Sequence, residues 1–297
     1  TLVSNVLAAM AGICCIPSSV EPMTWVSDNG EGSQTRETTR SIVAMANGLI
    51  DVEALLAEKD EHEVILPHTA DWFSTIRLPY AFDHEAKCPK WEAFLEKNLE
   101  MDPERIKLLQ EWAGYLLLPD TSFGKFLALE GEGRNGKSVF CCAIRAMLGQ
   151  ENCSSVSLEE FQDKFSRTQI IGKLLNIDPD VGELDRVSES FVKKVATGDK
   201  MFFDRKHIGG IECNATARLI LSWNTRPRFK DRSMGIWRRM LLVPWKVEIQ
   251  DHEVVLNMDT EWWWERSGEL PGIFMWALRG LIRLRGQGRF TASQLSQ

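Results

Sequence analysis

The sequence lacks the long apolar run that a membrane-spanning helix needs. No stretch approaches the roughly 18 apolar residues that such a helix requires, and we find no signal-peptide pattern, internal repeat or low-complexity tract. The chain has 297 residues, of which 44% are hydrophobic and 26% are charged. This composition is typical of a soluble globular protein with one large domain or two modest ones. We therefore expect no membrane partner.

Metal-binding cysteine patterns are also missing. None of the seven cysteines forms a C-x-x-C pair, and the five histidines do not complete a zinc pattern. The adjacent Cys141 and Cys142 lie in an apolar stretch, where core packing is the expected role. Reduced thiols indicate an intracellular compartment, so we expect a cytoplasmic protein.

An excess of positive charge is absent, because the net charge is −7. Taken alone, this value argues against a chain coated in nucleic acid, since affinity for DNA comes from neutralised phosphates. It leaves room for a small basic element within an acidic body. The chain begins at Thr1 without an initiator Met, which is typical of a fragment of a longer protein or of an engineered piece, and this leaves open a further N-terminal partner domain.

The strongest motif is a phosphate-binding loop at residues 131–138, which read G-E-G-R-N-G-K-S. Residues 125–129 predict a strand before it and residues 138–148 a helix after it, which is the setting that a P-loop requires. Glycines let the backbone curl around phosphates, Lys137 brings positive charge to the β- and γ-phosphates, and the Ser138 hydroxyl ligates Mg²⁺. The alternative is a glycine-rich turn with an incidental Lys-Ser pair. The predicted cofactors are ATP and Mg²⁺, held by Gly131, Gly133, Asn135, Gly136, Lys137 and Ser138.

A second apolar strand, in residues 173–180, is predicted to end in two carboxylates, Asp178 and Asp180. A P-loop ATPase needs an acidic residue at the end of a neighbouring strand to hold the magnesium shell and orient the attacking water. Both residues are therefore candidate catalytic and metal-binding groups. Pro179 separates them, which leaves open which one does which job. A turn with solvated carboxylates is the alternative.

Two later segments carry further candidates. Residues 219–224 read L-I-L-S-W-N, a strand whose final amide, Asn224, could position the lytic water. An ordinary strand followed by a turn is the alternative. Arg238 and Arg239 end the segment D-R-S-M-G-I-W-R-R, and a guanidinium can stabilise a transferring phosphoryl group, also from a neighbouring subunit. Surface salt bridges are the alternative for these arginines.

Strands and helices alternate after the P-loop, so we predict an α/β sandwich with a mainly parallel central sheet. The predicted strands lie at 174–177, 200–205, 217–223 and 240–243, and the helices at 190–196 and near 271–284. Upstream, helices are predicted to begin at Pro89 and after Asp102, and two short apolar segments flank the Asn47-Gly48 turn signal.

In order and spacing, these segments resemble superfamily-3 helicases, specifically the helicase portion of phage, plasmid and poxvirus-type primase-helicases. The matching stretches lie at 66–75, 78–83, 108–117, 131–138, 172–180, 191–199, 219–227, 231–239 and 269–281. The resemblance implies an AAA+-like ATPase that forms a ring, usually a hexamer, and translocates on single-stranded DNA. It also implies an N-terminal accessory domain (1–100), an ATPase core (101–250) and a C-terminal helical segment (251–297). A primase domain upstream in the same polypeptide is a further possibility.

The resemblance assigns roles to individual residues. Lys137 and Ser138 serve the phosphates and magnesium, Asp178 and Asp180 are the acidic pair, Asn224 is the sensor, and Arg239, with Arg238 as second choice, is the arginine finger. The DNA-contacting hairpin of the family falls at residues 198–210. There Arg205, Lys206 and His207 lie beside a Gly209-Gly210 turn and are expected to project from a hairpin tip. A solvated basic turn is the alternative.

These expectations lead to a ring-forming, ATP-dependent DNA helicase of a phage or plasmid-type replication protein, acting in a bacterial or phage-infected cell on single-stranded or forked DNA. One alternative keeps the ATPase as a DNA-stimulated loader or switch without processive unwinding. Another is a structural ring that binds nucleotide without turnover. For the run Trp262-Trp263-Trp264, packing of a C-terminal helix is favoured over a subunit interface or stacking on bases.

Overall fold

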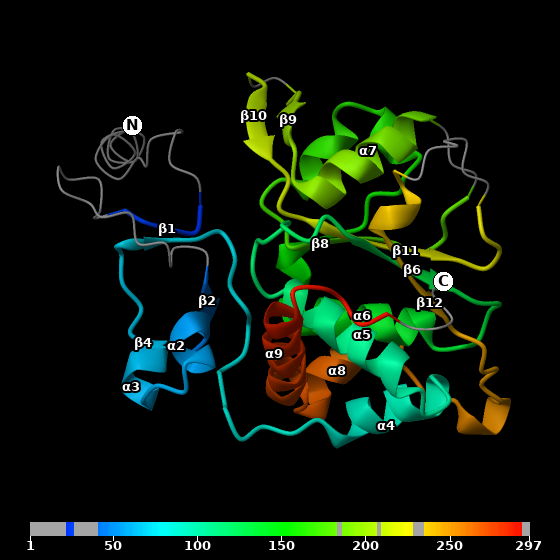
Figure 1. Cartoon of the computed structure of the whole chain (residues 1–297), viewed down its shortest axis with the longest axis horizontal. Coiled ribbons are helices and arrows are strands. Elements are labelled where there is room, and N and C mark those ends of the chain that lie inside the picture. Colours follow the sequence, from blue (N-terminus) through cyan, green and yellow to red (C-terminus); the bar gives the residue numbers. More distant parts are fainter. Residues whose placement is uncertain (1–21, 27–40, 183–185, 207–208, 228–234, 293–297) are drawn as a thin grey trace, which may run out of the picture.

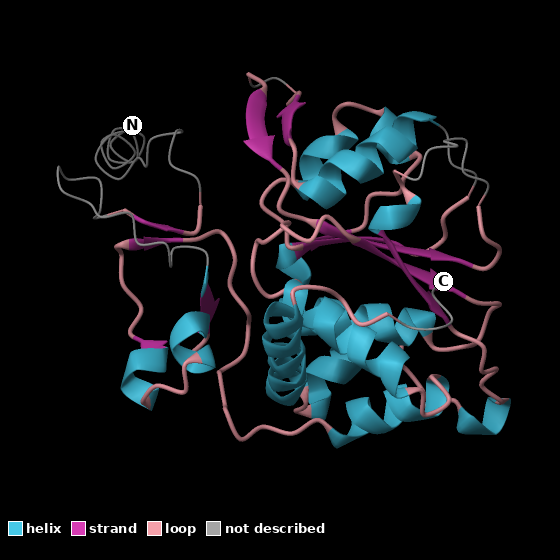
Figure 2. Ribbon diagram, viewed as in Figure 1, coloured by secondary structure: helices cyan, strands magenta, loops and turns pink. Residues whose placement is uncertain are grey.

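The computed structural model describes residues 22–26, 41–182, 186–206, 209–227 and 235–292. At its centre lies a five-stranded sheet in the order β12-β6-β11-β8-β7, with every neighbouring pair parallel. The strands are β6 (Phe126–Glu130), β7 (Cys153–Ser154), β8 (Leu175–Asp178), β11 (Arg218–Trp223) and β12 (Met240–Pro244). Helices cover both faces of this sheet (Figures 1 and 2). The predicted α/β sandwich with a mainly parallel sheet is confirmed.

The strands are mostly buried because each face of the sheet packs against a separate core. In β6, Leu127 and Leu129 belong to one core, whereas Phe126 and Ala128 belong to the other. This division follows from the alternation of side chains along a strand. All six residues of β11 and all four of β8 are buried.

Most of the helical mass lies on one face of the sheet (Figure 2). It comprises α4 (Pro89–Asn98), α5 (Pro103–Tyr115), α6 (Lys137–Leu148), α8 (Glu261–Ser267) and α9 (Leu270–Gln287). The opposite face carries α7 (Arg186–Thr197) and the short 3-10 turns η4 (Glu160–Gln162), η5 (Ser166–Ile170) and η6 (Trp237–Arg239). Two further 3-10 turns are η3 (Gln150–Asn152) and η7 (Asp251–Glu253). Among the described residues, no helix combines the length and apolar character needed to cross a bilayer.

A smaller group of elements precedes α4. It holds β1 (Thr24–Trp25), β2 (Ile42–Met45), β3 (Gly48–Asp51), α2 (Val52–Leu56), α3 (Glu61–Val64), β4 (Ile65–Leu66) and β5 (Trp72–Phe73). Strands β2 and β3 form an antiparallel hairpin around the predicted turn, and β1 pairs with β5. The Tyr80 hydroxyl donates to the Met147 carbonyl at 2.6 Å, which ties the following segment to the end of α6.

Helix α4 packs against helices that follow the P-loop. Trp91 stacks on Phe140 of α6 and meets Trp264 and Trp276 edge-on, with ring centroids 5.4–5.8 Å apart. The Glu269 carboxylate accepts the N–H groups of residues 90 and 91, at 3.0 and 2.9 Å, and so caps the first turn of α4. The predicted three-part division of the chain stays a prediction, but α4 lies structurally with the helices after the P-loop.

The tryptophan run divides between core and surface. Trp264 is fully buried and its indole N–H donates to the Met258 carbonyl at 2.9 Å, so the packing role is confirmed for this residue. Trp262 is 55% exposed, with the Arg266 guanidinium over its ring.

Candidate nucleotide-binding site

The loop between β6 and α6 has the backbone shape of a phosphate cradle. Gly136, the residue before α6, has φ of +91°, a conformation that strains any residue with a Cβ. A Cβ on Gly131 would overlap the carbonyl oxygen of Trp245, so this position also requires glycine. Arg134 adds a left-handed residue with φ of +61°. Gly136 has no side chain with which to cap α6, which leaves the positive end of the helix for an anion.

Lys137 lies inside this loop and is 7% exposed. Its ammonium donates to the Gly131 carbonyl and, at 3.3 Å, to Oδ1 of Asn224. Burial lowers the pKa of Lys137 from its ordinary value, and the carboxylate of Asp180 is near enough to oppose that shift. The lysine therefore contacts two predicted site segments, the P-loop and Asn224 after β11, and it is within electrostatic reach of Asp180 in the acidic pair.

The other predicted P-loop residues fall into two groups. Asn135 is buried, and its amide donates to the carbonyls of Glu132 and Trp245, so it braces the loop from within. Gly133 and Ser138 are exposed, and a Cβ on Gly133 would meet nothing within 4 Å. Within the described ranges the Ser138 hydroxyl, at the start of α6, makes no hydrogen bond. Together with the open space above Gly133, this arrangement would suit a triphosphate with its magnesium ion.

The structure distinguishes the two acidic residues. Asp178 ends β8 and is only 3% exposed. Its carboxylate accepts the Leu158 N–H at 2.7 Å and the Asp180 N–H at 3.4 Å. Burial raises the pKa of Asp178, and these hydrogen bonds act in the opposite direction. Asp180 is exposed and lies two residues beyond the strand. Its negative charge favours the protonated form of Lys137 and so opposes the lowering of the lysine pKa by burial.

One expectation about strand order is wrong. The acidic strand was expected beside the P-loop strand, but β11 pairs with both β6 and β8 and separates them. Asn224, which directly follows β11, therefore stands between the P-loop and the acidic pair. The N–H of Val181 donates to the Ser222 carbonyl at 2.8 Å, which folds the Asp180 segment back across the end of β11.

Two residues at this edge of the sheet carry a contact that the sequence did not single out. The Glu130 carboxylate accepts two hydrogen bonds from the Arg226 guanidinium, at 2.7 and 2.9 Å, and a third from the Trp223 indole at 3.0 Å. The Arg226 bonds lower the pKa of Glu130 below its ordinary value. Glu130 precedes the P-loop and Arg226 follows Asn224, so the pair clamps the two loops together. In the sequence, only the positions of Glu130 before the P-loop and of Arg226 after Asn224 could have suggested this contact.

Arg238 and Arg239 lie far from this cluster. They form η6, directly before β12, whose first residue pairs with Phe126 at the start of β6. The P-loop follows the other end of β6, so the two arginines and the P-loop occupy opposite edges of the sheet. Lys125 confirms the placement, because its ammonium donates to the Arg238 carbonyl at 2.5 Å. Arg239 donates to the Gly235 carbonyl at 2.7 Å.

The predicted basic hairpin exists. Strands β9 (Lys200–Phe203) and β10 (Ile211–Asn214) pair antiparallel and project from the body beside α7 (Figure 1). Lys206 is exposed near the tip, and the Arg205 guanidinium donates to the Gly209 carbonyl at 3.0 Å. His207 lies outside the described residues.

Comparisons with known proteins agree with this architecture. Residues 129–239, fewer than half of the chain, match the model of a family described as a family of unknown function, DUF5906. Among solved structures, three apo structures of the NrS-1 C-terminal region align with TM-scores of 0.51–0.53 at 13% identity.

The chain shares its fold with the NrS-1 C-terminal region. The alignments cover 73%, 77% and 88% of this chain. They span 56%, 60% and 71% of the NrS-1 chains, so this chain corresponds to little more than half of the first two.

Proposed function

We propose that this chain is an ATP- and Mg²⁺-dependent motor that assembles into a ring and moves along single-stranded DNA. The observation that carries the proposal is the convergence at one sheet edge of the P-loop, Asn224 and the acidic pair, with Lys137 in contact with Asn224 at 3.3 Å. The fold shared with the NrS-1 C-terminal region and the resemblance to superfamily-3 helicases support the same reading.

The residues at this edge suit triphosphate hydrolysis. Lys137 and the positive end of α6 bind the phosphates, and Ser138 holds the magnesium ion, which supplies charge neutralisation when it is bound. Asp180, exposed and close to Lys137, orients the attacking water, whereas Asp178 holds the strand end in place. Asn224 lies between them and positions the water by hydrogen bonding.

Placement of the arginines supports a ring. Arg239 stands at the sheet edge opposite the P-loop of its own chain, so it serves a phosphate only across a subunit boundary. The basic hairpin supports DNA as the substrate, because repeated tips around a ring concentrate positive charge in a channel despite the net charge of −7.

Strand displacement on a forked duplex with ATP and Mg²⁺ tests the proposal. Lys137→Ala should abolish both hydrolysis and unwinding. Lys59→Ala, which removes an exposed lysine from the N-terminal group, serves as the matched control and should leave both unchanged. Unwinding by Lys137→Ala at the parental rate would refute the motor.

A second candidate function is a nucleotide-binding ring without turnover. The contacts of Asp178 favour this function. Its carboxylate already accepts two backbone N–H groups, which leaves Asp180 as the exposed acid of the pair for metal and water. Phosphate release from the assembled protein separates the two functions, since only the motor shows Asp180-dependent release. A loader without unwinding is recognised by DNA-stimulated hydrolysis that persists while the strand-displacement assay shows no product.

A further inference from the structure

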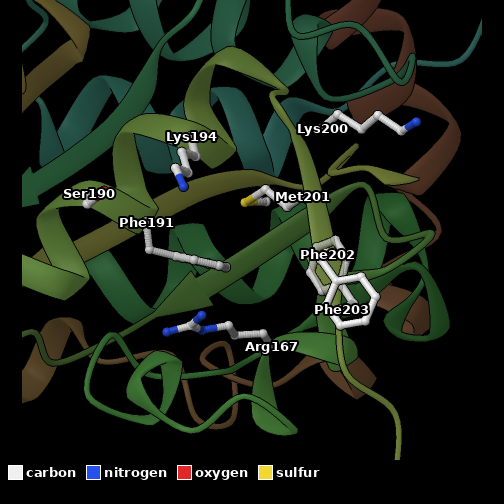
Figure 3. A pocket seen from close by; sticks show the side chains of 8 residues that line it. All are labelled: Arg167, Ser190, Phe191, Lys194, Lys200, Met201, Phe202 and Phe203. Atoms are coloured by element: carbon white, nitrogen blue, oxygen red, sulfur yellow. The ribbon is translucent and has the colours of Figure 1, made fainter. Parts of the chain in front are cut away.

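A pocket of about 530 Å³ lies beside α7 at the root of the basic hairpin, but its side chains do not converge. Phe203 packs into the core, whereas Phe202 points to the other face of β9. Phe191 lies between Arg167 and Lys194, so these two cations do not face a common point (Figure 3). The pocket therefore carries no ligand assignment.

An exposed apolar segment lies elsewhere, in the loop that follows β12. Val254, Val255 and Leu256 are consecutive in the chain and are 56%, 51% and 79% exposed. Single exposed apolar residues are normal on a protein surface, whereas contiguous apolar groups are a feature of interaction sites. We call these three residues the apolar patch.

Contacts with the body of the protein hold the apolar patch from both sides. Just before it, Gln250 and Glu253 form a capping box around η7, and the Glu253 carboxylate pairs with Lys97 of α4 at 2.9 Å. Just after it, the Met258 N–H donates to the Val255 carbonyl at 3.2 Å, and the Met258 side chain packs against the core. The exposure of the patch is therefore built into the fold.

The chain that leads to the apolar patch runs along the P-loop. The Ile249 N–H donates to the Arg134 carbonyl at 2.8 Å, and the Arg134 guanidinium pairs with Asp251. Asp251 raises the pKa of Arg134, and the exposed Glu248 adds to this shift. An acidic segment and the apolar patch therefore lie at the same sheet edge as the proposed phosphate site.

The opposite edge of the sheet, at η6, is cationic. Arg238 is exposed, Trp237 beside it is 37% exposed, and none of the three residues of η6 is acidic. Burial lowers the pKa of Lys125, and the nearby Arg239 lowers it further, so positive charges gather here. The two edges are thus complementary in charge, and each exposes apolar surface.

We propose that the apolar patch and Glu248 dock the η6 edge of a second copy of this chain. Leu256 packs against Trp237 of the neighbouring copy, and Glu248 faces its Arg238. The inference rests on the proposed function and names the surface through which the ring assembles. Opposite charges favour this orientation over contact between two patches, which would bring the two acidic segments together.

The proposed ring brings these two surfaces to the same place. Arg239 follows Arg238 in η6, so a copy whose Arg239 reaches a neighbour's phosphates also carries η6 to the P-loop edge. Only residues 250–253 separate the patch from Ile249, whose N–H is bonded to the P-loop. A stable interface covers about 20–30 residues on each partner, so the patch falls within its footprint.

Sedimentation velocity over a range of protein concentrations, with a non-hydrolysable ATP analogue and Mg²⁺, tests the patch. Leu256→Asp should weaken self-association at least about tenfold, because it would bury a carboxylate without a partner. Ile282→Asp is the matched control, since Ile282 is 47% exposed on α9, well apart from the orange segment 251–253 in Figure 1, and it should associate like the parent. Hydrolysis by Leu256→Asp should recover as the protein concentration rises, because its own nucleotide site is intact.

Charge reversal tests the occupant of the patch. Glu248→Arg and Arg238→Glu should each weaken association, and the double variant, which restores an opposite-charge pair at every contact, should regain it. Both side chains are exposed, so the fold should survive.

The outcomes separate this surface from the proposed function. Parental association of Leu256→Asp, or an equal loss in Ile282→Asp, would overturn the patch and leave the ring standing. Parental association of Arg238→Glu, or a double variant weaker than both single variants, would overturn the η6 edge as the occupant. A parent chain that stays monomeric with the ATP analogue and single-stranded DNA would overturn the ring and the patch together.

Discussion

Asp178 and Asp180 should respond in opposite ways to the same substitution. Asp178 is buried and its carboxylate accepts two backbone N–H groups, whereas Asp180 is exposed and acts on Lys137. We therefore expect Asp178→Asn to affect mainly folding stability and Asp180→Asn to affect mainly hydrolysis.

The magnitudes follow from these contacts. In Asp178→Asn the amide can still accept the N–H of Leu158, but its NH₂ group then faces the N–H of Asp180. The loss of one bond to a charged acceptor costs about 1–2 kcal/mol of unfolding free energy. Burial already raises the pKa of Asp178, so removal of its charge recovers part of the cost. Asp180→Asn should stay within about 0.5 kcal/mol of the parent, as exposed substitutions usually do. Its rate of hydrolysis should fall on the order of 10²-fold.

Urea unfolding and phosphate release, measured on the same preparations, give the two readouts. Asp120→Asn is a suitable control, because it removes a carboxylate from a surface turn after α5 and should change neither. A stable Asp178→Asn variant without hydrolysis, beside an Asp180→Asn variant at the parental rate, would reverse the assignment and refute the reasoning from burial.

Three further outcomes are expected. Glu269→Ala should lower the unfolding free energy by about 2–3 kcal/mol in urea titrations, because it removes two charge-assisted bonds at the start of α4. Glu130→Gln should be less stable than the parent at pH 7. Because Arg226 lowers the pKa of Glu130, the contribution of this group is present above the ordinary value of 4.5 and lost as the pH falls through the lowered one, so the difference in urea midpoint should shrink below pH 4.5. Arg239→Ala and Lys137→Ala should each be inactive alone but regain hydrolysis when mixed, and a mixture that stays inactive would contradict action across a subunit boundary.

Local pattern was enough to predict the main elements of the core. The strands before the P-loop and before Asp178 are short apolar runs bounded by polar residues, and both occur as expected. The helix after Asp102 also occurs, because that side chain accepts the N–H groups of residues 104 and 105. These features depend on residues that are close in the sequence, which is why they can be predicted without knowledge of the fold.

Order across the sheet could not be predicted in the same way. A buried parallel strand is apolar whichever strand lies beside it, so nothing in β8 or β11 indicated that β11 separates β8 from β6. The clamp between Glu130 and Arg226 was missed for the same reason, since 96 residues separate its partners. Asn135 was expected to face a ligand, yet its role as an internal brace depends on Trp245, more than a hundred residues away.

Strand β11 connects the basic hairpin to the proposed nucleotide site. Its amino end follows the hairpin strand β10 after three residues, and its carboxyl end leads directly to Asn224 beside Lys137. Every residue of β11 is buried, and strands on both sides hold it by hydrogen bonds. A close-packed strand of this kind resists local bending. Because β6 and β11 are paired, a displacement of the whole sheet would carry Lys137 and Asn224 together. Movement of the hairpin relative to these two residues therefore requires flexing where the hairpin joins the sheet, at residues 215–217.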